Sequence, residues 1–295
     1  MDVDKIRSLP RNHKKTYIAL LCAVYAILLL LTYYGFGETL KDIALDQIRA
    51  IADALITVFF AFLVVVPFFP QKGNSEIEEL HPQQITSEFE ELLRNANRWR
   101  YRGNFGRYFR GKVLPTLSGR QNVHVSACLI DPCDVELCRK HADYRGMINA
   151  IDKGRNYDEN VVSMEIIVTI VLASWYVVNR QMNVEIYLSG TFDPIRIDSN
   201  DYSMILTVED RRSPALKISN NHFTSQHFEL QMASARQQAR KINLGGVRQG
   251  IELPEINEED IKSVIVTADV DEVLGRISLK EIQLAFLRSK NPYEN

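Results

Sequence analysis

Residues 98–112, RWRYRGNFGRYFRGK, carry five arginines and one lysine and no acidic residue. Aromatic residues alternate with the basic ones, and three glycines permit tight backbone turns. Guanidinium groups bind phosphates through paired hydrogen bonds, and aromatic rings stack on nucleobases. The run therefore predicts a site for a nucleotide, a nucleic acid or the acidic surface of a partner. The candidate binding residues are Arg98, Arg100, Tyr101, Arg102, Arg107, Tyr108, Arg110 and Lys112.

Two other interpretations of this run stay open. It begins about 30 residues after a long apolar segment, so it also fits a basic collar at anionic lipid headgroups with its aromatic rings in the core. It also fits ordinary solvated structure. The net charge of −2 does not help to choose, because any affinity for an anion has to come from local clusters. A later stripe, Arg236, Arg240 and Lys241, is either a second phosphate-contacting face or a solvated helix face.

Motifs of common catalytic sites do not occur in the sequence. There is no Walker A loop, no Gly-x-Ser-x-Gly elbow and no His-Glu-x-x-His pair. The spacing of Cys128, Cys133 and Cys138 matches no zinc motif, and we expect reduced thiols in a cytosolic setting. We therefore expect a chain that is not an enzyme and has no cofactor and no metal. A membrane-bound hydrolase that depends on Asp131 or His222 is the alternative.

Two apolar segments, residues 17–34 and 50–69, are long enough to span a membrane and predict a transmembrane hairpin. Arg49 and Asp53 lie four residues apart at the start of the second segment. They form either a hydrated boundary pair or a polar ring at the mouth of an oligomeric pore. Lys and Arg are concentrated in the leader, which places both termini in the cytoplasm and the hairpin in the bacterial inner membrane.

Four regions follow from these boundaries. They are a basic cytoplasmic leader (1–16), the transmembrane hairpin (17–69), a polar linker (70–84) and a cytosolic mixed α/β sensor or binding domain (85–295). The predicted fold class is thus a membrane protein with an N-terminal two-helix hairpin followed by a mixed α/β domain.

The elements of the predicted α/β domain follow from hydrophobic periodicity and turn residues. Residues 161–178 are strongly apolar, but Glu165 interrupts the run, which suits a buried core helix better than a third span. Ser278 is a plausible N-cap for the last helix. Strands are predicted at 123–130, 184–188, 204–208, 215–218 and 263–268, and further helices at 85–98, 135–150, 225–242 and 278–289.

Two resemblances extend this picture. Two spans followed by a cytosolic α/β domain without catalytic residues resemble the two-transmembrane effectors of bacterial anti-phage defence, of the retron-associated type. The run RWRYRGNFGRYFRGKVLP, followed by LIDP at 129–132 and by Tyr144 and Arg145, resembles degenerate phospholipase-D-like domains. Catalytic members of that family carry a His-Lys-Asp motif that this chain lacks, so no catalytic residue carries over. The second resemblance implies a sensor or binding platform.

These resemblances imply a membrane-anchored toxic effector of an abortive-infection system. A nucleic-acid-containing partner, such as a reverse transcriptase with its RNA and DNA, would control the cytosolic domain. On release, hairpins in contact with membrane lipid would associate into homo-oligomers and disrupt the inner membrane. Two alternatives stay open: gating by a cyclic oligonucleotide, which is a nucleotide second messenger, and a non-toxic anchored adaptor that recruits a cytosolic partner.

Overall fold

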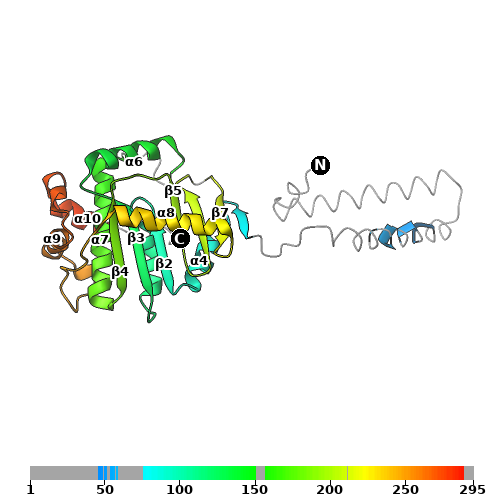
Figure 1. Ribbon diagram of the computed structural model, residues 1–295, viewed down its shortest axis with the longest axis horizontal. Coiled ribbons are helices and arrows are strands. Elements are labelled where there is room, and N and C mark those ends of the chain that lie inside the picture. Colours follow the sequence, from blue (N-terminus) through cyan, green and yellow to red (C-terminus); the bar gives the residue numbers. More distant parts are fainter. Residues whose placement is uncertain are drawn as a thin grey trace. The chain divides into compact units, whose positions relative to one another are not determined.

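The computed structural model describes residues 76–150, 157–210 and 212–288, together with helical residues between 46 and 58. The chain divides into two compact units, Met1–Asn74 and Ser75–Asn295. Most described residues belong to the second unit, which is a mixed α/β domain (Figure 1).

The described residues form one sheet of eight strands in the order β1-β7-β6-β5-β2-β3-β4-β8. Strands β2, β3 and β4 are parallel at its centre, and β5, β6 and β7 continue from β2 as an antiparallel meander. The strands are β1 (Ile77–Leu80), β2 (Arg98–Arg102), β3 (His124–Ile130), β4 (Asn183–Ser189), β5 (Ile195–Ser199), β6 (Ser203–Val208), β7 (Ala215–Ser219) and β8 (Arg240–Lys241).

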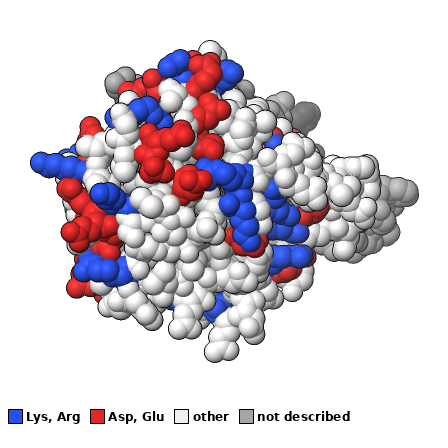
Figure 2. Space-filling model, turned by 60° about the vertical axis from the view of Figure 1, so that its left-hand side comes forward, with Lys and Arg blue, Asp and Glu red and all other residues white. Residues whose placement is uncertain are grey.

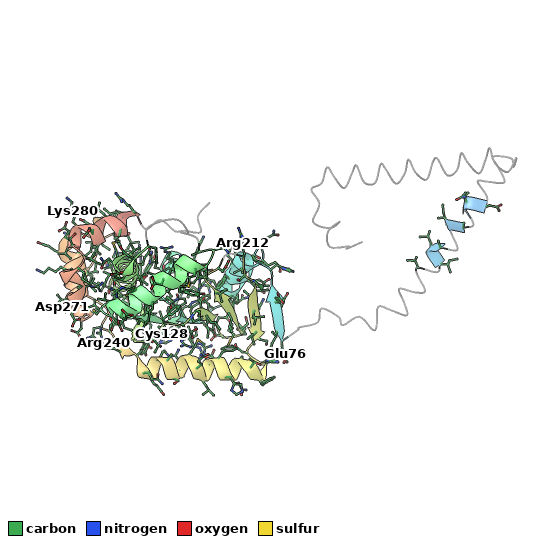
Figure 3. The ribbon with its side chains drawn as sticks, turned by 90° about the horizontal axis from the view of Figure 1, so that it is seen from above. Glu76, Cys128, Arg212, Arg240, Asp271 and Lys280 are labelled. Atoms are coloured by element: carbon green, nitrogen blue, oxygen red, sulfur yellow. The ribbon has the colours of Figure 1, made fainter. Side chains whose placement is uncertain are left out.

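Helix α8 covers one face of the sheet, and helices α4 and α7 pack on the opposite face (Figures 1 and 3). A large apolar cluster fills the α7 side, whereas a small one, centred on Met204, Ile218 and Met232, lies beneath α8. The helices are α4 (Ile85–Arg94), α5 (Leu114–Leu117), α6 (Val135–Met147), α7 (Glu159–Arg180), α8 (Phe223–Gln238), α9 (Glu258–Thr267) and α10 (Leu279–Arg288). Shorter helical turns are η2 (Phe109–Val113), η3 (Leu253–Glu255) and η4 (Asp271–Gly275).

Helix α7 confirms the predicted buried core helix. The carboxylate of Asp158 caps it by accepting hydrogen bonds from the backbone N–H groups of Asn160 and Val161. The sheet covers one side of this helix, and α9 and α10 cover another. The residues in its middle are therefore buried on nearly every side, and they are almost all apolar. A helix that is apolar all round belongs in a core or in a membrane, and here it is in the core.

The predicted fold class is corrected by this arrangement. The structure is a mixed α/β sheet domain, and its described residues show no N-terminal two-helix hairpin. Among them, α7 is the one helix long and apolar enough to cross a membrane, and 67% of its most apolar window is buried inside the domain. Length and composition alone do not separate a span from a core helix, so the apolar length of 17–34 and 50–69 was not enough to establish a hairpin.

The predicted inner-membrane location, with two spans and both termini in the cytoplasm, is corrected with it, because it depended on the predicted hairpin. The first predicted span, Arg49 and Asp53 lie outside the described residues. So does the second predicted span, apart from helical residues between 50 and 58.

Two further predictions of local structure need correction. Residues 263–268, predicted as a strand, lie in helix α9. Asn257 caps this helix in a reciprocal arrangement with Asp260, and Ile261, Val264 and Ile265 are buried at helical spacing. The local cap thus outweighs the strand preference of the β-branched residues. The predicted linker, residues 70–84, contains strand β1, which pairs with β7 at the edge of the sheet.

Gly246 provides a test of the packing of α9. Its φ is +81°, and an added Cβ would lie 2.7 Å from the backbone carbonyl carbon and oxygen of Ser263. Gly250 has nearly the same φ, +80°, but open space at the Cβ position. We expect Gly250→Ala to lower the free energy of unfolding by about 1 kcal/mol, the strain of the left-handed backbone, and Gly246→Ala by about 2–4 kcal/mol, because the clash adds to that strain. Equal losses in urea unfolding would contradict the close approach.

Candidate ligand-binding site

Strand β2 divides the basic aromatic run between the two faces of the sheet. Alternate residues of a strand point to opposite faces. Trp99 and Tyr101 are buried in the large apolar cluster, while Arg100 and Arg102 lie on the face that α8 covers. Rings and guanidinium groups that alternate in the sequence therefore do not form one continuous surface.

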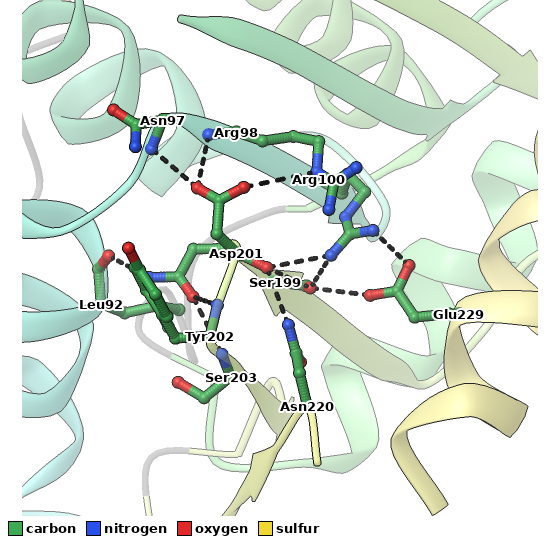
Figure 4. Close-up of polar contacts among 11 residues, drawn as sticks. Leu92, Asn97, Arg98, Arg100, Ser199, Asp201, Tyr202, Ser203, Asn220 and Glu229 are labelled. Carbon is green, nitrogen blue, oxygen red and sulfur yellow. Dashed lines mark hydrogen bonds and ion pairs between the residues drawn. The ribbon is translucent and has the colours of Figure 1, made fainter.

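Arg100 joins the centre of the sheet to α8 (Figure 4). Its Nη1 lies 2.6 Å from Oε2 of Glu229 on α8. Its Nη2 donates hydrogen bonds to Oγ of Ser199 at 2.8 Å and to the carbonyl of Asn200 at 2.9 Å. The Ser199 hydroxyl in turn donates to Glu229 at 2.9 Å. Burial lowers the pKa of Arg100, and the Glu229 carboxylate opposes this by favouring the charged guanidinium.

Polar side chains cross the sheet beneath α8 in two rows, which we call the polar rows. Residues that are partners in the strand register lie side by side on one face. The first row is Ser199, Arg100, Ser126 and Glu185, and the second is Arg102, Cys128 and Tyr187. A helix-covered face of a sheet is normally apolar, so these rows are unusual at the centre of a domain.

Helix α8 covers the polar rows with few buried contacts. Ser225 and Met232 are its buried side chains, and Phe228 packs partly against the small apolar cluster. Phe223 and Leu230 are 68% and 67% exposed. The Arg100–Glu229 pair and this small cluster thus provide much of the attachment of α8 to the sheet.

A cleft of about 390 Å³ lies between α8 and the carboxyl ends of β2 and β4. Nη2 of Arg102 lies 3.0 Å from Oδ2 of Asp193, and its Nη1 is buried with no hydrogen-bond partner among the described residues. Open α/β sheets commonly bind ligands at the carboxyl ends of their strands. The lining residues are Arg102, Ser189, Gly190, Thr191, Gln231, Ser234, Ala235 and Gln238.

Arg236 of α8 adds a second guanidinium group near the cleft. It is half-buried and forms no ion pair with the residues that the structure describes. Burial raises the pKa of Cys128 to about 11, and both Arg102 and Arg236 oppose that rise because their charges favour the thiolate. The charges of both guanidinium groups therefore act on the Cys128 thiol.

Arg107 and Arg110 share the carboxylate of Glu165 on α7. Nη2 of Arg107 lies 2.6 Å from Oε1 of Glu165, and Arg110 binds its Oε2. Arg110 also donates to the hydroxyl of Thr169 at 2.9 Å. Burial alone would raise the pKa of Glu165, but the two guanidinium groups outweigh it and lower the pKa to about 2. These two arginines thus join η2 and the segment before it to α7.

Glu209, which follows β6, is the centre of a second buried charge cluster. It contacts His141 at 3.2 Å, forms an ion pair with Arg145 and accepts a hydrogen bond from Asn104 at 2.8 Å. Burial would raise its pKa, but His141, Arg145 and Asn104 together lower it to about 2. The guanidinium of Arg145 lies 4.9 Å from the centre of the Phe105 ring.

The remaining candidates lie apart from the cleft. Arg98 is half exposed and lies 3.6 Å from Asp201, whose carboxylate also accepts its backbone N–H (Figure 4). Tyr101 and Tyr108 are buried in the core, and burial raises the pKa of Tyr101. Lys112 is half-buried on η2.

Sequence reasoning missed the residues that complete the site. Glu229 and Asp193, the carboxylate partners of Arg100 and Arg102, carry no local signal. The Ser-Gly-Thr turn at residues 189–191 directly follows a predicted strand. Because ligands commonly bind at the carboxyl ends of strands, this turn could have indicated a binding site from the sequence. The predicted stripe is also divided: Arg236 lies on α8, whereas Arg240 and Lys241 form strand β8.

Charges of both signs are interspersed on the face drawn in Figure 2, around a broad uncharged area. A protein that binds an extended nucleic acid usually shows a stripe of one sign. No such stripe appears on this face. The described residues also contain no group of three His, Cys, Asp or Glu side chains that could hold a metal ion.

Comparisons with known proteins leave the family open. No family model matches the chain, and no curated protein matches it. Ten chains of solved structures match, among them one from the structure of TrmBL2, described as an archaeal chromatin protein with a novel mode of DNA binding. That match has 12% identity and a TM-score of 0.35 and covers 70% of each chain. A TM-score this low supports no conclusion about fold or function.

Glu165 and Glu209 make the free energy of unfolding depend on pH in the acid range. Each carboxyl has a pKa of about 2 in the folded protein and an ordinary value of 4.5. Their stabilisation is present above pH 4.5 and is lost as pH falls towards 2. A shift of this size corresponds to about 3 kcal/mol for Glu165. We therefore expect Glu165→Gln to lower the unfolding free energy by about 3 kcal/mol at pH 7 and to flatten its decline below pH 4.5.

The matched control is Glu136→Gln on α6. Its side chain is 61% exposed and pairs with Arg139 at the surface, so we expect a change below about 1 kcal/mol. The measurement is urea unfolding between pH 2.5 and 7. A Glu165→Gln variant with the wild-type acid profile would show that this carboxylate does not stabilise the fold.

Proposed function

We propose that residues 76–288 form a non-catalytic sensor domain that binds an anionic ligand or partner at the polar rows, and that α8 responds to binding. The observation that supports this most is the position of Arg100 and Arg102. These two arginines of a central strand lie on a sheet face that one sparsely attached helix covers.

The chemistry of the polar rows favours an anionic ligand. Both arginines are held by carboxylates from other parts of the chain, Glu229 on α8 and Asp193 in the loop after β4. A phosphate or carboxylate of a ligand can replace such a partner, because guanidinium groups bind either anion with the same geometry. Replacement of Glu229 frees α8 from the centre of the sheet, which links binding to a structural change.

The titratable groups whose pKa values are strongly shifted do not favour catalysis at neutral pH. Burial raises the pKa values of Cys128, Cys133 and Cys138 to about 11–12, so their thiols stay protonated. Glu165 and Glu209 are held in ion pairs, with pKa values of about 2. General acid–base catalysis works best with a pKa near the operating pH, which none of these groups has.

A sensor of this kind fits the degenerate phospholipase-D-like resemblance and control by a nucleic-acid-containing partner or a nucleotide second messenger. Its place in an anti-phage defence system stays a prediction. Membrane disruption depended on the two-span hairpin and is not part of this proposal.

Hydrogen exchange of the full chain tests the role of α8. Glu229→Gln removes the charge that pairs with Arg100, and we expect the amides of α8 to exchange about tenfold faster, with those of α7 unchanged. Glu185→Gln is the control, because Glu185 also lies in the polar rows and is equally exposed, 26%, but pairs with Lys241 of β8. If α8 is as protected as α7 and Glu229→Gln leaves it so, α8 is a fixed part of the core and the proposal fails.

A further inference from the structure

We propose that the cleft beside Arg102 is a phosphate-binding pocket for a small phosphorylated ligand such as a mononucleotide. Arg102 binds the phosphate, and the hydroxyl groups of Ser189, Thr191 and Ser234 complete its shell. Arg236 of α8 does not line the cleft but adds a second positive charge beneath the helix. The inference rests on the proposed sensor function and names its ligand class.

The positive charge that lines the cleft favours an anionic ligand. Arg102 is its one charged lining residue, and no carboxylate is among the lining side chains. One amino group of Arg102, Nη1, is buried without a hydrogen-bond partner in the described part of the chain, and burying an unsatisfied donor is costly. A phosphate oxygen supplies the missing acceptor. Arg236 brings a second positive charge that no described carboxylate neutralises.

The turn after β4 supplies hydrogen-bond donors. The hydroxyl of Ser189 lies 2.9 Å from that of Thr191 and accepts the Thr191 backbone N–H at 3.1 Å. An added Cβ on Gly190, between them, would meet nothing within 4 Å, so the space above the backbone is open. Hydroxyl groups next to an open strand end suit an oxygen-rich anion.

The size of the cleft indicates a small ligand. Its volume of about 390 Å³ is within the range of about 300–1,000 Å³ of small-molecule sites. Gln231 and Gln238 offer amide groups for the polar edge of a base or a sugar. Both belong to α8, as does Ser234, so a ligand in the pocket contacts α8 directly.

Titration calorimetry on the full chain tests the pocket. The probes are AMP, ribose 5-phosphate and inorganic phosphate, with uncharged adenosine as the negative control. We expect AMP binding that weakens with salt, and a loss of at least about tenfold in affinity for Arg102→Gln and for Arg236→Gln. Arg236→Gln leaves the Arg102–Asp193 pair in place, so it tests the pocket even if Arg102→Gln disturbs the fold.

Arg139→Gln is the matched control, because it removes the same charge from an exposed position on α6. Its affinity should equal that of the wild type. Tighter binding of AMP than of inorganic phosphate supports a nucleotide, and equal binding supports the free anion in the same pocket. Failure of every phosphorylated probe to bind, or full affinity in both arginine variants, overturns the inference.

The two proposals fail separately. Phosphate binding with a fixed α8 keeps the pocket and removes the sensor role of the helix. Release of α8 by Glu229→Gln, with no phosphate binding, keeps the movable helix and removes the pocket.

Discussion

Four arginines of residues 98–112 have side chains at most 16% exposed, and a guanidinium group removed from water in this way needs a carboxylate partner. No acid is available within the run itself. The partners come from α8, from the loop after β4 and from α7, so the ion pairs join β2 to α8 and to that loop, and η2 with the segment before it to α7. They are Glu229, Asp193 and Glu165.

These pairs have different consequences on the two faces of the sheet. On the α7 side, Glu165 is held by two arginines beside a large apolar core, and its pKa of about 2 keeps it charged in any physiological medium. On the α8 side, Arg100 and Arg102 each have one carboxylate partner, next to a small apolar cluster. The first arrangement stabilises a fixed core, whereas the second, in which each arginine has one carboxylate partner, is the basis of the anion binding that we propose.

The order and direction of the strands determine where the cleft lies. Strand β2 pairs with parallel β3 on one side and antiparallel β5 on the other, so chain direction in the sheet changes there. Arg102 ends β2 and Ser189 ends β4, and both reach the same edge because these strands are parallel. Helix α8 lies along this face of the sheet (Figure 3), and its residues Gln231, Ser234, Ala235 and Gln238 line one side of the cleft. The fold thus brings a basic strand end, a hydroxyl-rich turn and a helix into one place.

The sequence by itself determined the features that depend on residues close along the chain. These are the core helix at 161–178, the buried strand at 123–130 and the Ser278 cap. It also named Arg100 and Arg102 as binding candidates. Strand β2 was not predicted, because the alternation of basic and aromatic residues was interpreted only as a binding motif and not as the alternation of a strand. Only the tertiary structure decided which face each arginine occupies, that 263–268 is helical, and that Glu229 and Asp193 pair with Arg100 and Arg102. Propensities and caps are local, whereas an ion pair depends on how the chain brings distant residues together.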